Sequence, residues 1–278
     1  MAAITAQAVK ELRDLTDLPM MDVKKALVDA DGDQNRAIEL LKERNKKVML
    51  KRLENATSEG LIRVGTSADG SLGGMIELQC ESAPVAKADD FLFLADQLVK
   101  QLLAGPGATT PEELLDQPAP DRPGLKLGEL LEEVVGKIRE KMVLARVLRA
   151  PGPVGVYAHH DGKTGVLFRA SGETKNVPVL KDVAMHVAAL KPIATHPEEL
   201  PADQVAAEKA RLTTEAAASG KPANIVEKIV EGRMKTYFAE NGVLTFQLFA
   251  KDDSKTVSQA LAESGLKATG FTRWILGN

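Results

Sequence analysis

The chain has 278 residues, a length that suits two or three domains better than one small core. Its hydrophobic fraction of 44% and charged fraction of 27% are those of a soluble globular protein. The net charge of −3 argues against a dedicated nucleic-acid-binding protein, because such proteins usually have a basic balance.

The sequence also limits the compartment. Its one cysteine, Cys80, excludes an intramolecular disulfide and fits a reducing environment. No apolar run approaches the roughly 20 residues of a membrane span, and the first residues lack the basic and apolar regions of a signal peptide. We therefore expect a cytoplasmic protein with no membrane partner.

Residues 1–55 predict a module of three short helices. Thr5 is positioned to cap the first helix, in which Val9, Leu12 and Leu15 form an apolar repeat. Pro19 disfavours helical dihedrals at the preceding residue and should separate the first helix from the second, over 20–30. Asp33 should cap the third helix. A unit of this size has a thin core, which is typical of an adhesive module and not of an active site.

The basic stretch over residues 41–52, "LKERNKKVMLKR", leaves two interpretations open. A run of this kind is usually the solvated end of a helix, and the alternative is a phosphate-binding surface.

Residues 56–142 predict a first α+β subdomain. Two strand-like segments, 60–66 and 72–80, flank an Asp-Gly pair and form a hairpin. Helices should follow over 87–105 and 127–142, with a short helix between them that starts after Thr110 because Thr-Pro-Glu-Glu is a capping box with proline at the first position.

Residues 143–278 predict a second subdomain with the same order of elements. A hairpin with an Asp-Gly turn spans 152–170, a helix spans 179–192, and a late strand over 267–276 returns to the sheet; a last helix should start at Lys255. The fold class is therefore α+β, with two core subdomains built on antiparallel sheets.

A helical hairpin is predicted as an insertion at about 200–240. Gly220 and Pro222 can end one helix and start the next, so the two helices should be antiparallel. Their apolar stripes are narrow, enough for each other and little else, which is typical of a projecting hairpin. The stripe residues are Val205, Leu212, Ala216, Ile225 and Ile229.

The candidate chemical groups do not form a catalytic or metal site. Adjacent strand residues such as His159 and His160 should point to opposite faces, so they cannot easily grip one metal ion. His186 lies among apolar residues of a helix and should be a packed, hydrogen-bonded histidine. Glu77 and Glu81 disfavour a thiolate at Cys80. The glycines of 65–74 join two strands and offer no helix N-terminus to a phosphate. The sequence therefore favours a protein that works by binding and is not an enzyme.

Several long segments resemble one family, the bacterial elongation factors Ts, over essentially the whole chain. Residues 4–41, with Met20-Met21-Asp22 and Lys24-Lys25-Ala26-Leu27, are similar to the family's N-terminal module, which is related to ubiquitin-associated (UBA) domains. Further similar segments are "DVAMHVAALKP" (182–192), "GKPANIVEKIVEGRMK" (220–235), "KDDSKTVSQAL" (251–261) and "GFTRWILG" (270–277).

The resemblance implies an activity and a partner. Such factors bind the GDP form of elongation factor Tu, disturb its magnesium and phosphate site, and promote release of GDP and exchange for GTP. No cofactor of the chain's own is implied, because GDP, GTP and magnesium belong to the partner. The implied assembly is a heterodimer with elongation factor Tu, with a higher assembly left open, and no direct contact with nucleic acid.

The resemblance also points to the loop of residues 82–85. In the family this loop reads Thr-Asp-Phe-Val after a cysteine, and here Ser82, Ala83 and Pro84 replace the first three residues while Cys80, Val85, Ala86 and Lys87 match. The family's phenylalanine wedges into the partner, and losing such an anchor should cost roughly 2–4 kcal/mol. Three interpretations stay open. The partner's pocket has changed to match the new residues, or other contacts contribute more of the binding energy, or the loop now has only a structural role.

Two other implied contacts match better. Met20 and Met21 match the surface that docks on a partner helix, and exposed methionines suit an adaptable apolar contact, although a buried role for one of them stays open. His159 matches a histidine that approaches the partner's nucleotide-binding domain, while His160, Asp161 and Lys163 make the hairpin tip bulkier than in the family. The alternative function is a binding or holding partner of elongation factor Tu with little exchange activity; catalysis through His159 is a distant third.

Overall fold

A computed structural model describes residues 4–16, 18–52, 54–173 and 177–278; in the third helix it does not describe the side chains at positions 45, 46, 48, 49 and 51. The chain divides into two compact units, each described by itself. Unit 1 holds residues 1–61, 76–147 and 277, and unit 2 holds residues 62–75, 148–276 and 278. The predicted subdomain boundaries at residues 55 and 142 stay a prediction.

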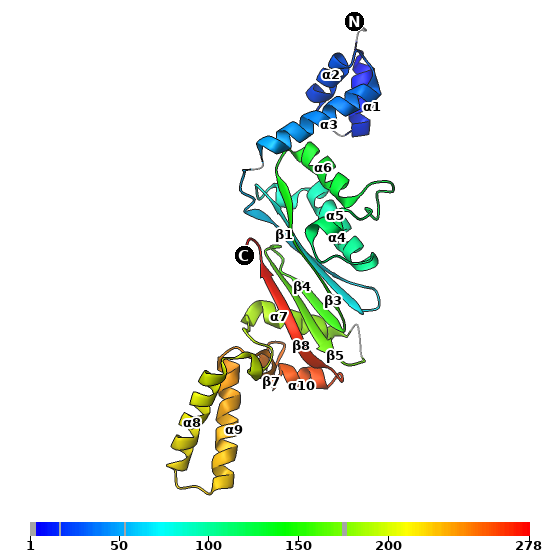
Figure 1. The fold of residues 1–278 in the computed structure, drawn as a ribbon. Helices are drawn as coiled ribbons and strands as arrows, with labels where there is room; N and C mark the ends of the chain where they lie inside the picture. Colours follow the sequence, from blue (N-terminus) through cyan, green and yellow to red (C-terminus); the bar gives the residue numbers. More distant parts are fainter. Residues whose placement is uncertain (1–3, 17, 53, 174–176) are drawn as a thin grey trace. The chain divides into compact units, whose positions relative to one another are not determined.

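Unit 1 begins with the three predicted helices, α1 (Ala6–Thr16), α2 (Met20–Asp29) and α3 (Gln34–Lys51) (Figure 1). Both predicted caps are present: Thr5 Oγ1 accepts the Ala8 N–H at 3.1 Å, and Asp33 Oδ1 accepts the Arg36 N–H at 3.1 Å. The apolar side chains between the helices form a small separate cluster. The helices form where caps and prolines divide the sequence.

One residue of this module was placed wrongly. Leu15 is 69% exposed, whereas Val9 and Leu12 are buried. An α-helix turns every 3.6 residues, so two successive steps of three residues rotate the third side chain off the buried stripe.

A three-stranded sheet comes next in the chain, with the strands in the order β1-β2-β3, and residues 59–61, 76–80 and 142–147 of its strands belong to unit 1. The strands are β1 (Glu59–Thr66), β2 (Leu72–Cys80) and β3 (Met142–Pro151), and the helices between β2 and β3 are α4 (Asp89–Ala104), α5 (Pro111–Leu115) and α6 (Leu127–Ile138). The main core of unit 1 lies between these strands and helices. Thr110 Oγ1 accepts the Glu113 N–H at 3.2 Å, as the capping box predicts.

The helix expected over 127–142 ends at Ile138, so its assignment to residues 139–142 is wrong. Strand β3 was not predicted, and residues 143–151 had no assignment. The segment Met142–Pro151 contains leucine, alanine and arginine, which favour helices as single residues. Pairing with β2 overrides that preference, since strand formation depends mainly on packing against neighbouring strands.

Unit 2 contains a second antiparallel sheet in the order β4-β5-β8. Its strands are β4 (Val154–Ala158), β5 (Thr164–Ser171) and β8 (Lys267–Ile275). Helices α7 (Pro178–Leu190) and α10 (Val257–Ala262) share a core with these strands. The predicted order of hairpin and then helix is confirmed in both sheets, and β8 pairs with β5 as expected.

The last helix starts later than predicted. Lys255 belongs to β7 (Asp252–Thr256), which pairs with the short strand β6 (Leu248–Phe249), and α10 begins at Val257. Thr256 sets the start, because its Oγ1 accepts the Gln259 N–H at 3.3 Å and Gln259 Oε1 accepts the Thr256 N–H at 2.8 Å.

The predicted helical hairpin consists of α8 (Ala202–Ala217) and α9 (Ala223–Glu240), whose apolar side chains form a cluster of their own. Val205, Leu212, Ala216 and Ile229 belong to this cluster. Ile225 does not: it is 42% exposed, and Val226, Val230 and Met234 face α8 in its place at four-residue spacing.

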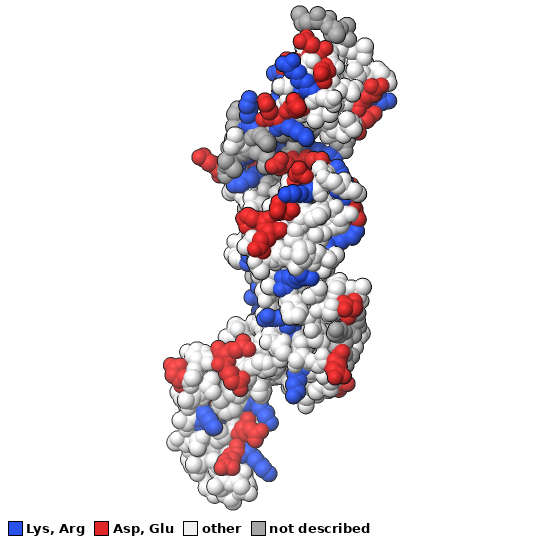
Figure 2. Space-filling model, turned by 45° about the vertical axis from the view of Figure 1, so that its right-hand side comes forward, with Lys and Arg blue, Asp and Glu red and all other residues white. Residues whose placement is uncertain are grey.

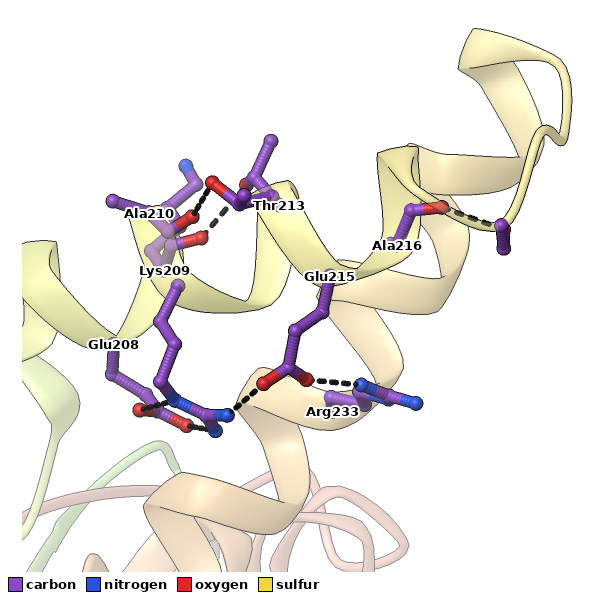
Figure 3. Close-up of polar contacts among 10 residues, drawn as sticks. Glu208, Lys209, Ala210, Thr213, Glu215, Ala216 and Arg233 are labelled. Atoms are coloured by element: carbon purple, nitrogen blue, oxygen red, sulfur yellow. Dashed lines mark hydrogen bonds and ion pairs between the residues drawn. The ribbon is translucent and has the colours of Figure 1, made fainter.

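Exposed ion pairs and hydrogen bonds line the outside of this hairpin (Figure 3). Arg211 pairs with Glu208 and Glu215 on its own helix, and Glu215 also accepts from Arg233 of α9 at 3.0 Å. Because these groups are solvated, they add little to stability, and the narrow apolar seam holds the two helices together.

Across the described part of the chain, no helix is both long and apolar enough to cross a membrane.

Candidate functional site: the loop after strand β2

The loop predicted as a partner contact joins β2 to the short 3₁₀ helix η1 (Val85–Lys87). Ala83 and Pro84 are exposed at its tip, whereas Ser82 and Val85 are partly buried. Val85 packs against the main core of unit 1. The exposed tip therefore consists of two small side chains without a polar group, and the residues on either side hold it.

Ser82 is anchored by a carboxylate. Its N–H donates to Glu140 Oε2 at 3.0 Å and its hydroxyl donates to Glu140 Oε1 at 2.6 Å. Hydrogen bonds to an ionised acceptor are stronger than those between neutral groups. The side chain that was predicted to meet a partner is thus occupied within the chain itself.

Glu81, directly before Ser82, has three donors of its own. It accepts from Arg52 Nη1 at 2.9 Å, from Asn55 Nδ2 at 2.8 Å and from the Lys141 N–H at 2.6 Å. Desolvation raises the pKa of Glu81, but the hydrogen bonds from Lys141, Arg52 and Asn55 outweigh it and hold the pKa below the ordinary value of 4.5. The start of the loop is therefore tied to the end of α3 and to the start of β3.

The backbone of the loop is also fixed. Ser82 O accepts the Ala86 N–H at 3.3 Å, Pro84 O accepts the Lys87 N–H at 3.2 Å, and Val85 O accepts the Ala88 N–H at 3.0 Å. Pro84 has φ −61° and ψ −38°, in the ordinary helical region. A stiff tip lowers the ordering cost of docking on another surface.

Four residues that build this site were not predicted to belong to it: Arg52, Asn55, Glu140 and Lys141. Glu140 follows Ser82 by 58 residues, and no local motif links the two. The tertiary fold brings them together where β3 begins beside the end of β2.

Met20 and Met21 lie at the start of α2 and are both exposed, by 54% and 72%. The structure thus decides against a buried role for one of them. A pair of flexible apolar side chains in solvent suits an adaptable contact surface, and the docking role itself stays a prediction.

His159 lies in the β4–β5 turn of unit 2, where its Nδ1 is 3.0 Å from the Tyr157 hydroxyl. The argument that His159 and His160 point to opposite faces of a strand is wrong, because β4 ends at Ala158 and the two rings pack with centroids 4.2 Å apart. Among the described residues, no cluster of three or more histidine, cysteine, aspartate or glutamate side chains could hold a metal ion.

His186 and Cys80 are structural, as predicted. His186 is buried, its Nε2 lies 2.9 Å from Gln247 Oε1, and its Nδ1 accepts the Ala250 N–H at 3.1 Å. Burial raises the pKa of the Cys80 thiol to about 11, with further contributions from Glu140, Glu59 and Glu81. Glu77 lies on the other face of β2 from Cys80, because residues three apart in a strand point to opposite sides.

The basic stretch over 41–52 is partly neutralised where its side chains are described. Arg44 pairs with Asp29, and Arg52 pairs with Glu81; the side chains of Lys46 and Lys51 lie outside the described ones. Figure 2 shows acidic and basic side chains interspersed over the N-terminal helices and over the helical hairpin. This mixture is typical of a solvated surface.

The three predicted contact regions therefore lie on separate elements: the start of α2 and the 82–85 loop in unit 1, and the β4–β5 turn in unit 2. Each is partly or fully exposed. The contact role of each region stays a prediction.

Comparison with known proteins supplies the family. The family model described as Elongation factor TS matches residues 81–278. A protein named Elongation factor Ts from Paenarthrobacter aurescens (strain TC1) is 41% identical over 285 residues, which cover 100% of both chains. Proteins of the same name from Kineococcus radiotolerans (40%, 100% of both chains) and Polynucleobacter asymbioticus (39%, 100% of this chain and 91% of the relative) are similar to the same degree. The chain therefore belongs to the elongation factor Ts family of translation elongation factors.

Proposed function

We propose that the protein binds elongation factor Tu in its GDP form and promotes release of GDP and its exchange for GTP. Similarity at about 40% identity along the whole chain carries this proposal. The exposed methionines of α2 and the anchored loop after β2 supply surfaces of the kind that such binding needs. The chain acts by binding, and the nucleotides and magnesium belong to the partner.

The proposed mechanism is thermodynamic coupling. A factor that weakens GDP binding to elongation factor Tu must itself be bound more weakly when GDP is present, by the same factor. Entry of GTP then displaces the factor from its partner. No covalent step takes place on this chain.

The test is release of a fluorescent GDP analogue from the cognate elongation factor Tu, chased with excess unlabelled GDP. We expect the release rate constant to rise with the concentration of this protein and then saturate. A rate constant that stays at the value of elongation factor Tu alone would refute the exchange function.

A second candidate is a partner that keeps elongation factor Tu folded without accelerating exchange. The tip of the 82–85 loop favours it, because Ala83 and Pro84 carry neither a charge nor an aromatic ring. Complex formation on a sizing column, together with an unchanged rate of GDP release, would select this candidate.

A further inference from the structure

The 82–85 loop is held at its first residue by one side chain from elsewhere in the fold. Both Glu140 carboxylate oxygens accept from Ser82, one from the N–H at 3.0 Å and the other from the hydroxyl at 2.6 Å. Glu140 stands two residues before β3, and the residue between them, Lys141, donates its N–H to Glu81 Oε1 at 2.6 Å. The pair therefore joins the loop to the sheet.

The exposed tip has no comparable anchor. Ala83 and Pro84 have no side-chain group that could form a hydrogen bond, and their position follows from what holds the residues beside them. On the other side, Val85 sits against the core. Backbone hydrogen bonds hold the C-terminal side of the loop, and on the N-terminal side the position of the tip follows from Ser82, whose N–H and hydroxyl both bind Glu140.

We propose that Glu140 is a positioning residue for nucleotide exchange, acting through Ser82 to fix the place and shape of the Ala83-Pro84 tip. The inference rests on the proposed function and extends it. An apolar tip of two small residues cannot polarise or charge-pair with a partner. Its side chains can make only steric and apolar contacts, and holding them in one conformation lowers the ordering cost of docking.

The experiment compares five variants in the GDP-release assay at saturating and at limiting concentrations. Glu140→Ala removes both acceptors, Glu140→Gln keeps one amide oxygen, Ser82→Ala removes one donor, and Ser82→Thr keeps the hydroxyl. Glu132→Ala is the matched control, because Glu132 is an exposed glutamate of α6.

Glu140→Ala should slow saturated release by about tenfold, as expected for lost hydrogen bonds to a charged acceptor. Ser82→Ala and Glu140→Gln should have smaller effects, and Ser82→Thr and Glu132→Ala should match wild type. The double variant Glu140→Ala, Ser82→Ala should be no slower than Glu140→Ala alone, because both changes break the same contact.

A second readout does not depend on the partner. In the free protein, amide hydrogen exchange of the peptide covering residues 81–88 should be faster in Glu140→Ala than in Glu132→Ala, while peptides of α4 stay protected. This result separates a loosened loop from an unfolded unit. If Glu140→Ala does not fold, the comparison of Ser82→Ala with Ser82→Thr carries the test.

Three results would overturn the inference. One is a folded Glu140→Ala that matches Glu132→Ala in the release assay, and another is unchanged hydrogen exchange over residues 81–88. The third is slower GDP release with Glu140→Ala, together with equal release rates for Ser82→Ala and Ser82→Thr. In all three, wild type still accelerates release, whereas failure of wild type itself would refute the proposed function.

Discussion

At the scale of single residues, the start of the 82–85 loop is held by several hydrogen bonds, whereas its exposed tip has only small side chains without a polar group. Glu81 accepts from Arg52, just after α3, and from the N–H of the residue before β3, while Ser82 donates twice to Glu140 and accepts the Ala86 N–H. The residues at the exposed tip, Ala83 and Pro84, have side chains without a polar group. The polar groups of the neighbouring Glu81 and Ser82 form hydrogen bonds within the protein, and these bonds hold the loop in its conformation.

The first prediction concerns this tip. Restoring the family's aspartate and phenylalanine with Ala83→Asp and Pro84→Phe should speed GDP release from an elongation factor Tu whose own factor Ts carries these residues. The gain should be tenfold or more, since a buried aromatic anchor contributes about 2–4 kcal/mol. The backbone permits the change, because the dihedral angles of Pro84 are those of an ordinary helical residue.

Rates measured with the cognate partner provide the comparison. A slower release there would indicate a partner pocket adapted to the small tip. Equal rates with both partners, before and after the change, would mean that the tip makes no useful contact.

The second prediction concerns the methionines of α2. Replacing Met20 and Met21 together by alanine should weaken the complex with elongation factor Tu by about tenfold, because two exposed apolar side chains lose their contact area. The dissociation constant can be measured by titration calorimetry with nucleotide-free partner. Met185→Ala, another exposed methionine, is the matched control and should bind as wild type does; an unchanged constant for the double variant would remove α2 from the interface.

At the scale of elements, the helical hairpin depends on a thin apolar seam. Leu212 is 4% exposed and packs against α9. Leu212→Ala should destabilise the hairpin by about 2–5 kcal/mol, the usual cost of truncating a buried leucine. Hydrogen exchange of α8 and α9 peptides would detect this as faster local opening.

Ile225→Ala is the matched control, because Ile225 points into solvent. It should leave the exchange of both helices nearly unchanged. Equal effects of the two substitutions would show that the seam lies elsewhere than between Leu212 and α9.

A second element-scale prediction follows from His186, which ties α7 to residues 247–250. Desolvation lowers its pKa below the ordinary value of 6.5, and the hydrogen bond to Gln247 opposes this only in part. In the unfolded chain His186 therefore binds a proton at a higher pH than in the folded protein. The contribution of neutral, buried His186 to folding stability is therefore fully present above the unfolded pKa of about 6.5, and it is lost as the pH falls toward the folded pKa.

The thermal midpoint should therefore fall between pH 7 and pH 5 in wild type and fall less in His186→Gln. His160→Gln, which changes an exposed histidine, should keep the wild-type pH dependence. The same slope in all three proteins would mean that His186 does not control it.

At the scale of the whole molecule, the proposed function requires reciprocity between two ligands of elongation factor Tu. Saturating GDP should weaken binding of this protein to elongation factor Tu by the same factor by which this protein weakens binding of GDP. Both factors can be measured by titrating one ligand in the absence and in the presence of the other. Binding that does not respond to GDP would contradict exchange and favour the holding function.

The sequence by itself determined most of the local structure of this protein. Helix starts at Thr5, Asp33 and Thr110, the break at Pro19 and the two Asp-Gly turns depend on hydrogen bonds and dihedral angles within a few residues. These short-range preferences act in any fold. The sequence also contains several long segments that resemble the elongation factor Ts family, and this resemblance predicted the family before the structure was known.

Only the tertiary structure decided which distant residues meet. It made a strand of Met142–Pro151, turned Val226 inward and Ile225 outward, and placed Glu140 on Ser82. Each outcome depends on packing or on a contact between residues far apart in the chain, where neighbouring strands and helices outweigh local propensity. The loop after β2 is one example. The sequence identifies its tip, but the carboxylate that binds Ser82 lies 58 residues further along the chain, and only the fold brings the two together.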